Sequence, residues 1–277
     1  MGTVGTTNSV LTGRSIENND FQRVRRIIHD YAGIFINEGK EALVQSRLMK
    51  RMRVLGISSF SDYLDLIEKE RPGGEFLSFA DVLTTNKTSF FRESKHFDYI
   101  KKVVFPTMNG RSAKWWSAGC SSGEEPITMG ILLHESQDMV NPSRVKILAT
   151  DLSRKVLGIA KEGIYSDYKV TDVPPAILNK YFNRTPDNAF QVAPVIKNMI
   201  TYGRLNLTEP WPMKGDFQVI MCRNVMIYFN RKTQEDIIRK FHALLEPGGH
   251  LFLGHSESMN ASALGFENVA PAVYRKK

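Results

Sequence analysis

Two carboxylates follow a run of small residues in the stretch WWSAGCSSGEEP, which covers residues 115–126. The apolar start is typical of a buried strand, and the small residues of Ser117–Gly123 would let a ligand approach the backbone closely. Ligands of open parallel sheets bind at the carboxyl ends of the strands, which is where this turn is expected. A turn of Gly and Ser can also simply pack a helix against a strand, so the neighbouring residues decide between the two interpretations.

Asp151 ends the next expected strand, VKILATD. An acid at the end of the second strand is where a nucleoside ribose is held through its hydroxyls. The alternative is that Asp151 caps the helix expected in LSRKVLGIAKEG. The two roles are compatible, and we favour contact with a ribose.

The charge beside the turn distinguishes two nucleoside cofactors. A dinucleotide site has the pattern G-x-G-x-x-G, whose amides and helix N-terminus bind a pyrophosphate. Here G-C-S-S-G is followed by Glu124 and Glu125, which would repel a pyrophosphate and attract a cofactor with an ammonium and a sulfonium. S-adenosylmethionine therefore fits better than NAD. The later stretch LLEPGGHLFLGH has the helix, turn and strand order common in class I methyltransferases.

The elements that position these residues follow from hydrophobic periodicity. After residue 114, short apolar runs alternate with helical segments, which predicts a mostly parallel, Rossmann-like sheet with crossover helices. We expect strands at AKWWSAG, VKILATD, MITYGRLNL, FQVIMCRN and GHLFLGH. A segment at about 164–200, with Pro-Pro, a short helix and the alternating run AFQVAPVI, predicts a small antiparallel β insertion.

The front third is expected to be all helical. Apolar residues recur at helical spacing in NDFQRVRRIIHDYAGI and KEALVQSRLMKRMRVLGI, in a third segment after Ser58-Ser59, and in EFLSFADVL. Residues 1–15 are small and polar without periodicity. We therefore expect a flexible arm at 1–15, a helical domain at 16–91 and a cofactor-binding domain at 92–277.

Composition limits the class of protein. The chain has 277 residues, is 42% hydrophobic, and contains no apolar run long enough for a bilayer span. Its N-terminus lacks the blocks of a signal peptide, so we expect a cytoplasmic protein without direct membrane insertion. Cys120 and Cys222 are far apart and fit no metal-ligand spacing, so neither a disulfide nor a metal site is expected.

The net charge of +8 is concentrated near the N-terminus, where residues 21–60 contain eight bases and three acids. Arg47, Lys50 and Arg51 stand at i, i+3 and i+4 and therefore share one helix face. Such a face suits an acidic protein partner, although an ordinary solvated face is about as common.

Several motifs together resemble those of the bacterial chemotaxis receptor methyltransferases, the CheR family. They are LTTNKTSFFRE (83–93), WSAGCSSGEEP (116–126), ATDLS (149–153), Asn206-Leu207, MCRNVMIYF (221–229) and LEPGGHLFLGHSE (245–257). The resemblance implies a class I methyltransferase that uses S-adenosylmethionine, with an N-terminal helical domain. It also implies the reaction: methylation of receptor glutamate γ-carboxylates to methyl esters, with S-adenosylhomocysteine as the other product.

The resemblance assigns roles to individual positions. It places the Tyr228 hydroxyl beside the transferred methyl, and we hypothesise that Arg92 and Tyr228 are catalytic residues that orient the incoming glutamate. We also expect the basic face of Arg47, Lys50 and Arg51 to contact the acidic receptor helix. The implied cofactor contacts are Asn86, Thr88, Arg92, Gly119, Glu125, Asp151, Asn206, Leu207, Arg223 and Asn224. Tyr228 could instead be a core residue, Glu124 a simple helix N-terminal acid, and His255 a general base, although we favour a structural hydrogen-bonding role for His255.

The chemistry needs no catalytic base, because a glutamate with an unperturbed pKa of ~4.3 is already ionised. Family members that dock on a receptor tail peptide have a Gly-x-Gly turn in the β insertion, whereas NRTPDNAFQV here lacks that pair. We therefore expect no binding of the pentapeptide tether. The partners implied are chemoreceptors with acidic, glutamate-bearing helices, and the protein is expected to be a monomer recruited to receptor arrays.

Two other functions compete with this one. The pI of 9.4 suits a nucleic-acid methyltransferase. That class is not supported, because the sequence lacks both the Asn/Asp-Pro-Pro-aromatic motif and a Pro-Cys nucleophile, so we expect no nucleic-acid partner. The other alternative is an adaptor that binds S-adenosylmethionine without catalysis in a receptor-coupled pathway.

Overall fold

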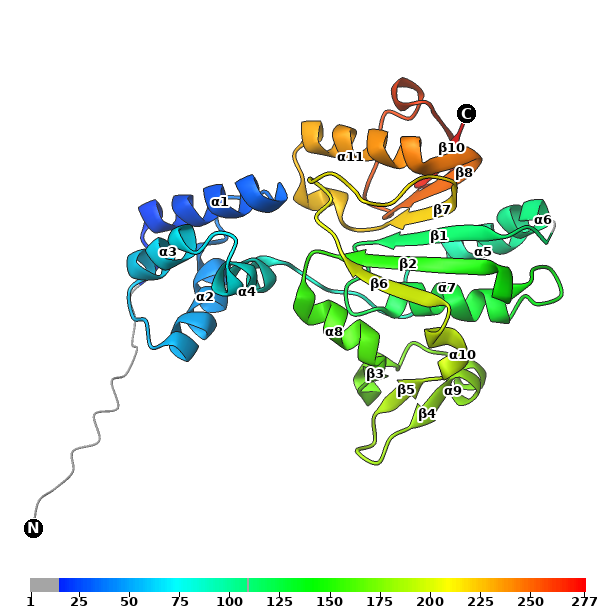
Figure 1. The fold of residues 1–277 in the computed structure, drawn as a ribbon, viewed down its shortest axis with the longest axis horizontal. Coiled ribbons are helices and arrows are strands. Elements are labelled where there is room, and N and C mark those ends of the chain that lie inside the picture. The colour runs from blue at the N-terminus through cyan, green and yellow to red at the C-terminus, as the bar shows by residue number, and fades with distance from the viewer. Residues whose placement is uncertain (1–14, 109) are drawn as a thin grey trace, which may run out of the picture. The chain divides into compact units, whose positions relative to one another are not determined.

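The computed structural model describes residues 15–108 and 110–277, so nearly all of the arm expected at 1–15 lies outside the described residues. The chain divides into two compact units (Figure 1). The first runs to Tyr31 and continues over Phe35–Thr84, and the second contains Ala32–Ile34 and Thr85–Lys277. The boundary after Thr84 lies earlier in the chain than the one expected from the sequence.

The first unit is helical in its described residues, as expected. Its helices are α1 (Asn18–Ala32), α2 (Glu41–Leu55), α3 (Phe60–Lys69) and α4 (Gly74–Leu83). The α2 stripe of Val44, Leu48 and Met52 is buried, which confirms the helical spacing. Gly56 ends α2 in the left-handed region at φ +70°, and the Ser59 side chain accepts a hydrogen bond from the Asp62 amide at the start of α3.

The second unit is built on a seven-stranded sheet with the order β6-β2-β1-β7-β8-β10-β9. The five expected strands form its parallel part: β1 (Ala113–Ala118), β2 (Val145–Asp151), β6 (Ile200–Arg204), β7 (Phe217–Cys222) and β8 (Leu245–Leu253). The predicted mostly parallel sheet is therefore confirmed. Strands β9 (Phe266–Ala270) and β10 (Val273–Lys276) extend it as an antiparallel edge that the sequence analysis missed.

Helices pack on both faces of this sheet. The face that carries Trp115 packs with α5 (Lys95–Tyr99), the π-helical turn Ile100–Val104, α6 (Phe105–Met108), α7 (Glu124–His134) and α8 (Arg154–Glu162). The face that carries Trp116 packs against α11 (Arg231–Leu244), drawn in orange in Figure 1. The two tryptophans are fully buried on opposite faces because successive residues of a strand alternate, so both are packing residues.

The β insertion is a three-stranded antiparallel sheet of order β3-β5-β4, with β3 (Ile164–Tyr165), β4 (Phe182–Arg184) and β5 (Phe190–Val192), which confirms the expectation. Its helices are α9 (Pro175–Tyr181) and α10 (Pro194–Lys197), with a 3-10 turn at Asp167–Lys169. Lys169 forms an ion pair of 2.9 Å with the buried Glu124, and the Tyr165 hydroxyl donates to the Ser122 carbonyl at 2.7 Å. The insertion is thereby fixed to the turn that follows β1.

Further 3-10 turns lie at Pro142–Arg144, Met226–Tyr228 and Ser262–Leu264. None of the helices in the described part of the chain combines the length and hydrophobicity needed to span a lipid bilayer.

Candidate cofactor-binding site

The turn after β1 is bound to the end of β2. The amides of Gly119 and Cys120 both donate to the Thr150 carbonyl, at 2.8 and 2.9 Å. Gly119 has φ +84°, and a Cβ built on it would lie 2.4 Å from Cγ2 of Val225, in the loop after β7. Glycine is therefore required here, both by the backbone conformation and by the close approach of that loop.

Asp151 supports the same turn through one carboxylate oxygen and the segment before α8 through the other. One accepts from the Ser121 amide at 2.8 Å and the other from the Ser153 amide at 2.9 Å. The residue that caps α8 is Ser153, which accepts from the Val156 amide, so the interpretation of Asp151 as the helix cap is wrong. Contact between Asp151 and a ribose stays a prediction.

A buried guanidinium connects three segments beside this turn. Arg223, directly after β7, pairs with Glu93 at 3.2 Å and with Glu125 at 3.3 Å, and it also donates to the Arg92 carbonyl. Only 2% of the Arg223 side chain is exposed. We call Arg223, Glu93 and Glu125 the Arg223 cluster.

The Arg223 cluster contains two carboxylates and one guanidinium, so its formal charge is −1 when both acids are ionised. Burial opposes ionisation of Glu93, but Arg223 and the His255 amide outweigh it and hold the pKa of Glu93 below its usual value. Burial raises the pKa of Glu125, although Arg223 and the Ser117 hydroxyl, which donates to Glu125 at 2.7 Å, oppose that shift. A buried surplus of negative charge is costly alone and favours a cationic ligand.

Backbone strain is concentrated at the same edge of the sheet. Phe91, Glu93, Ser121 and Asn224 have φ values of +54°, +55°, +50° and +58°, a region that residues other than glycine seldom adopt. Such conformations persist only where surrounding contacts enforce them, and they gather at functional sites. The strain thus marks the segment before α5, the turn after β1 and the loop after β7 as one site.

The loop after β7 is held by Glu257, a residue to which the sequence analysis gave no role beyond its place in a motif. The buried Glu257 carboxylate accepts from the amides of Gly254, Asn224 and Ile227 at 2.6, 2.9 and 3.2 Å. Burial raises the pKa of Glu257, and these amides counteract the shift. A Cβ on Gly254 would lie 2.5 Å from the Asn224 side chain, so the loop also requires glycine at that position.

The two residues expected to be catalytic both contact the segment before α5. Arg92 donates from Nη1 to the Lys87 carbonyl at 2.9 Å, and the Tyr228 hydroxyl lies 3.5 Å from the Thr85 carbonyl. Both side chains are partly exposed, so Tyr228 is not a core residue.

The remaining expected cofactor-contact residues are partly or fully buried. The Asn86 carbonyl accepts from the Ser121 hydroxyl at 3.0 Å, and Thr88 is half-buried. The Asn206 side chain accepts from the amide and hydroxyl of Thr208, which orders the turn after β6, and Leu207 is buried. Their contacts with a cofactor stay predictions.

The three residues expected to bind the receptor lie in the first unit, and they differ in exposure and in the bonds that they make within that unit. Arg47 donates to the Leu83 carbonyl at 2.8 Å. Arg51 binds both oxygens of Glu75, at 3.1 and 2.5 Å, which joins α2 to α4. Lys50 is exposed. Two of the three cations therefore already stabilise the helical unit.

Comparisons with known proteins match both units to domains of one family. Residues 19–84 match the family domain described as CheR methyltransferase, all-alpha domain, and residues 86–274 match the CheR methyltransferase, SAM binding domain. The chain is 38% identical to the chemotaxis protein methyltransferase of Borreliella burgdorferi, over 95% of both chains. It is 40% identical to the probable chemotaxis protein methyltransferase of Rhizobium etli, over 90% of this chain and 96% of that one. Identity to the chemotaxis protein methyltransferase of Escherichia coli is 37%, over 87% and 84% of the two chains.

Replacement of Glu257 tests whether its carboxylate positions the loop after β7. Glu257→Ala leaves the amides of Gly254, Asn224 and Ile227 without this acceptor, and the buried Gly254 amide alone costs about 1–3 kcal/mol when unsatisfied, so we expect lower stability and weaker binding of S-adenosylhomocysteine. Glu257→Gln keeps one acceptor oxygen and should fall between Ala and wild type. Tryptophan fluorescence in urea and titration calorimetry measure the two effects.

Glu246→Gln is the matched control for Glu257, because Glu246 lies in β8 and pairs with the exposed Arg111 side chain at 3.1 Å. It should change stability by no more than about 0.5 kcal/mol. Cofactor affinity in Glu257→Ala equal to that of the control would show that the carboxylate does not position the loop.

Proposed function

Because the chain belongs to the CheR family of S-adenosylmethionine-dependent methyltransferases, we propose that it methylates glutamate γ-carboxylates on chemoreceptor helices. The products are glutamyl methyl esters and S-adenosylhomocysteine. The observation that carries the proposal is the Arg223 cluster, whose surplus negative charge lies at the carboxyl edge of the parallel sheet. A cation is the ligand that this charge favours, and the family cofactor carries two positive groups.

The residues present fit that cofactor. The Arg223 cluster, through Glu125, provides negative charge for the amino-acid end of the cofactor. Gly119 has no side chain, so a ligand can approach the backbone of the turn. Asp151 and Asn206 lie at the ends of β2 and β6, where a nucleoside is held in such sheets. When bound, S-adenosylmethionine supplies a methyl group on a positively charged sulfur. The chain's own residues align the acceptor and exclude water.

Arg92 and Tyr228 are the residues proposed to align the acceptor carboxylate. Arg92 uses one N–H for the Lys87 carbonyl, and a guanidinium has five such donors. Its remaining donors and the Tyr228 hydroxyl can bind the oxygen of the glutamate that does not attack. Correct alignment alone contributes several kcal/mol to such reactions, with ~7–11 kcal/mol as the upper range. A very tight ion pair would weaken the nucleophile, so partial exposure of Arg92 suits the role.

A labelled-methyl assay tests the proposal. Wild type is incubated with radiolabelled cofactor and a receptor cytoplasmic fragment, and mild alkali should release volatile methanol from the product ester. Arg92→Ala and Tyr228→Phe should each lower kcat at least about tenfold, with folding retained. Arg231→Ala is the control, since Arg231 is exposed and pairs with Glu235 one turn further along α11.

Methyl label that resists alkali, or label found in RNA, would contradict the proposed substrate. Normal rates in both Arg92→Ala and Tyr228→Phe would remove these two residues from the mechanism without affecting the substrate assignment.

We further propose that α2 faces the acidic receptor helix through Lys50, supported by its exposure beside the internally bonded Arg47 and Arg51. Lys50→Glu should raise the KM for the receptor fragment at least about threefold and leave kcat unchanged, because only a surface attraction is reversed. Lys69→Glu reverses another exposed cation of the same unit and serves as control. Equal KM values for the two variants would show that Lys50 of α2 does not contact the receptor.

The β insertion is proposed not to bind a receptor tail peptide. Its turn at 185–189 is closed by the Thr185 amide, which donates to the Ala189 carbonyl at 2.9 Å, and Asn188 takes the positive φ of +58°. The Gly-x-Gly pair that the resemblance associates with tether docking is replaced here by residues with side chains. Calorimetry with a receptor C-terminal pentapeptide should show no saturable heat, and tight one-to-one binding would refute the proposal.

A further inference from the structure

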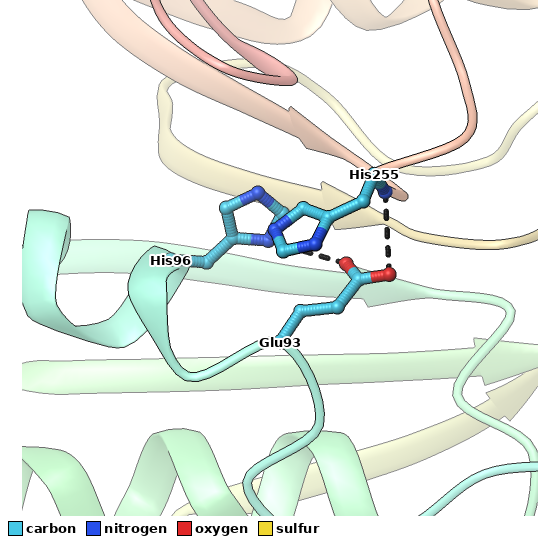
Figure 2. Close-up of side chains that lie close together, drawn as sticks. All are labelled: Glu93, His96 and His255. Carbon is cyan, nitrogen blue, oxygen red and sulfur yellow. Dashed lines mark hydrogen bonds and ion pairs between the residues drawn. The ribbon is translucent and has the colours of Figure 1, made fainter.

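Glu93, His96 and His255 come together from separate parts of the second unit, as Figure 2 shows. Glu93 precedes α5, His96 lies in α5, and His255 follows β8. Each offers one ligand atom, and the three atoms lie within 4.8 Å of one another. We propose that these three side chains form a binding site for a divalent transition-metal ion of the zinc type.

The buried imidazole of His96 provides the second observation. Its exposure is 1%, and among the described residues neither of its ring nitrogens makes a hydrogen bond of normal geometry, although the ring also interacts with the Pro271 backbone. A buried polar group without a hydrogen bond lowers the stability of the folded protein by about 1–3 kcal/mol. Its Nδ1 lies 3.6 Å from Oε2 of Glu93, and its ring centroid lies 4.8 Å from that of His255. A metal ion bound by one ring nitrogen would remove that penalty.

The ligand set selects the kind of ion. Two imidazoles and one carboxylate suit zinc and its neighbours, whereas magnesium and calcium prefer oxygen ligands. With bonds of about 2.0–2.2 Å, two ligand atoms on one tetrahedral zinc lie about 3.4 Å apart, so a separation of 4.8 Å must shrink by about 1.4 Å. His255 can make this movement because it is exposed, and its exposure leaves the fourth position to water.

The charges around the site allow a cation. Arg223 binds Oε2 of Glu93 at 3.2 Å and opposes a metal, but Glu125 on the other side of Arg223 offsets that positive charge. The backbone amide of His255 donates to Oε1 of Glu93 at 3.2 Å, so the hydrogen-bonding role expected for His255 belongs to its main chain and its ring remains a ligand. The Asn224 side chain also donates to Oε1 of Glu93, at 3.4 Å. A carboxylate has about four lone-pair positions, so these three bonds leave one position for a metal. The sequence analysis expected no metal because it examined cysteine spacing.

Zinc titration of the full-length protein, prepared free of metal and without cofactor, tests the proposal. Calorimetry should show one equivalent of bound zinc, and His255→Ala should weaken it at least about tenfold, since a ligand is removed. His29→Ala is the control, because His29 lies beside Asp30 at the surface of the first unit, 3.8 Å away. Excess magnesium should not displace the zinc.

A second measurement avoids any effect of substitution on folding. In the unmodified protein, the side-chain nitrogen NMR signals of His96 and His255 should shift together during the titration. The proposal is overturned by absence of saturable zinc binding, by full binding in His255→Ala, or by loss of binding in His29→Ala. The test uses neither receptor nor cofactor, so its outcome is independent of the proposed methyl transfer.

Discussion

The ion pairs of the buried Arg223 guanidinium are the constraint on which the rest of the site depends. They tie the segment before α5, the start of α7 and the end of β7 to one point. Removal of one partner from a buried ion pair typically costs about 3–5 kcal/mol, because the other charge is left unpaired. The cluster also leaves one carboxylate in excess. The same group therefore stabilises the edge of the sheet and provides charge for a cationic ligand.

The other features of the edge follow from that convergence. When three segments meet at one buried charge, their backbones must approach closely, and Gly119 and Gly254 are the positions where a side chain would collide. The positive φ angles at Glu93 and Asn224 add backbone strain, which destabilises this edge of the sheet. The Glu257 carboxylate opposes that strain because it binds three amides of the loop after β7 and of the segment after β8. A site strained in this way holds its polar groups in place before any ligand arrives, which is what catalysis by alignment requires.

Local patterns were sufficient to predict much of this fold. The apolar runs of β1, β2, β6, β7 and β8 predict the parallel sheet, and helical spacing predicts the first unit. Glu125 and Asp151 could be selected because they follow strands whose ends must meet. The pairing of Arg223 with Glu93 could not, since 130 residues separate them and only the folded chain brings them together. For the same reason, nothing local shows that Arg47 and Arg51 bond within the helical unit, that Glu257 caps a loop, or that His96 and His255 lie side by side.

The most direct test of the account is the calorimetric affinity of Glu125→Gln for S-adenosylhomocysteine. The substitution keeps the shape of the side chain and an oxygen for the Ser117 hydroxyl, but it removes the surplus negative charge of the Arg223 cluster. If that charge binds the α-ammonium group of the ligand, the affinity falls at least about tenfold, which is 1.4 kcal/mol. Unchanged affinity in a folded variant would contradict the central claim.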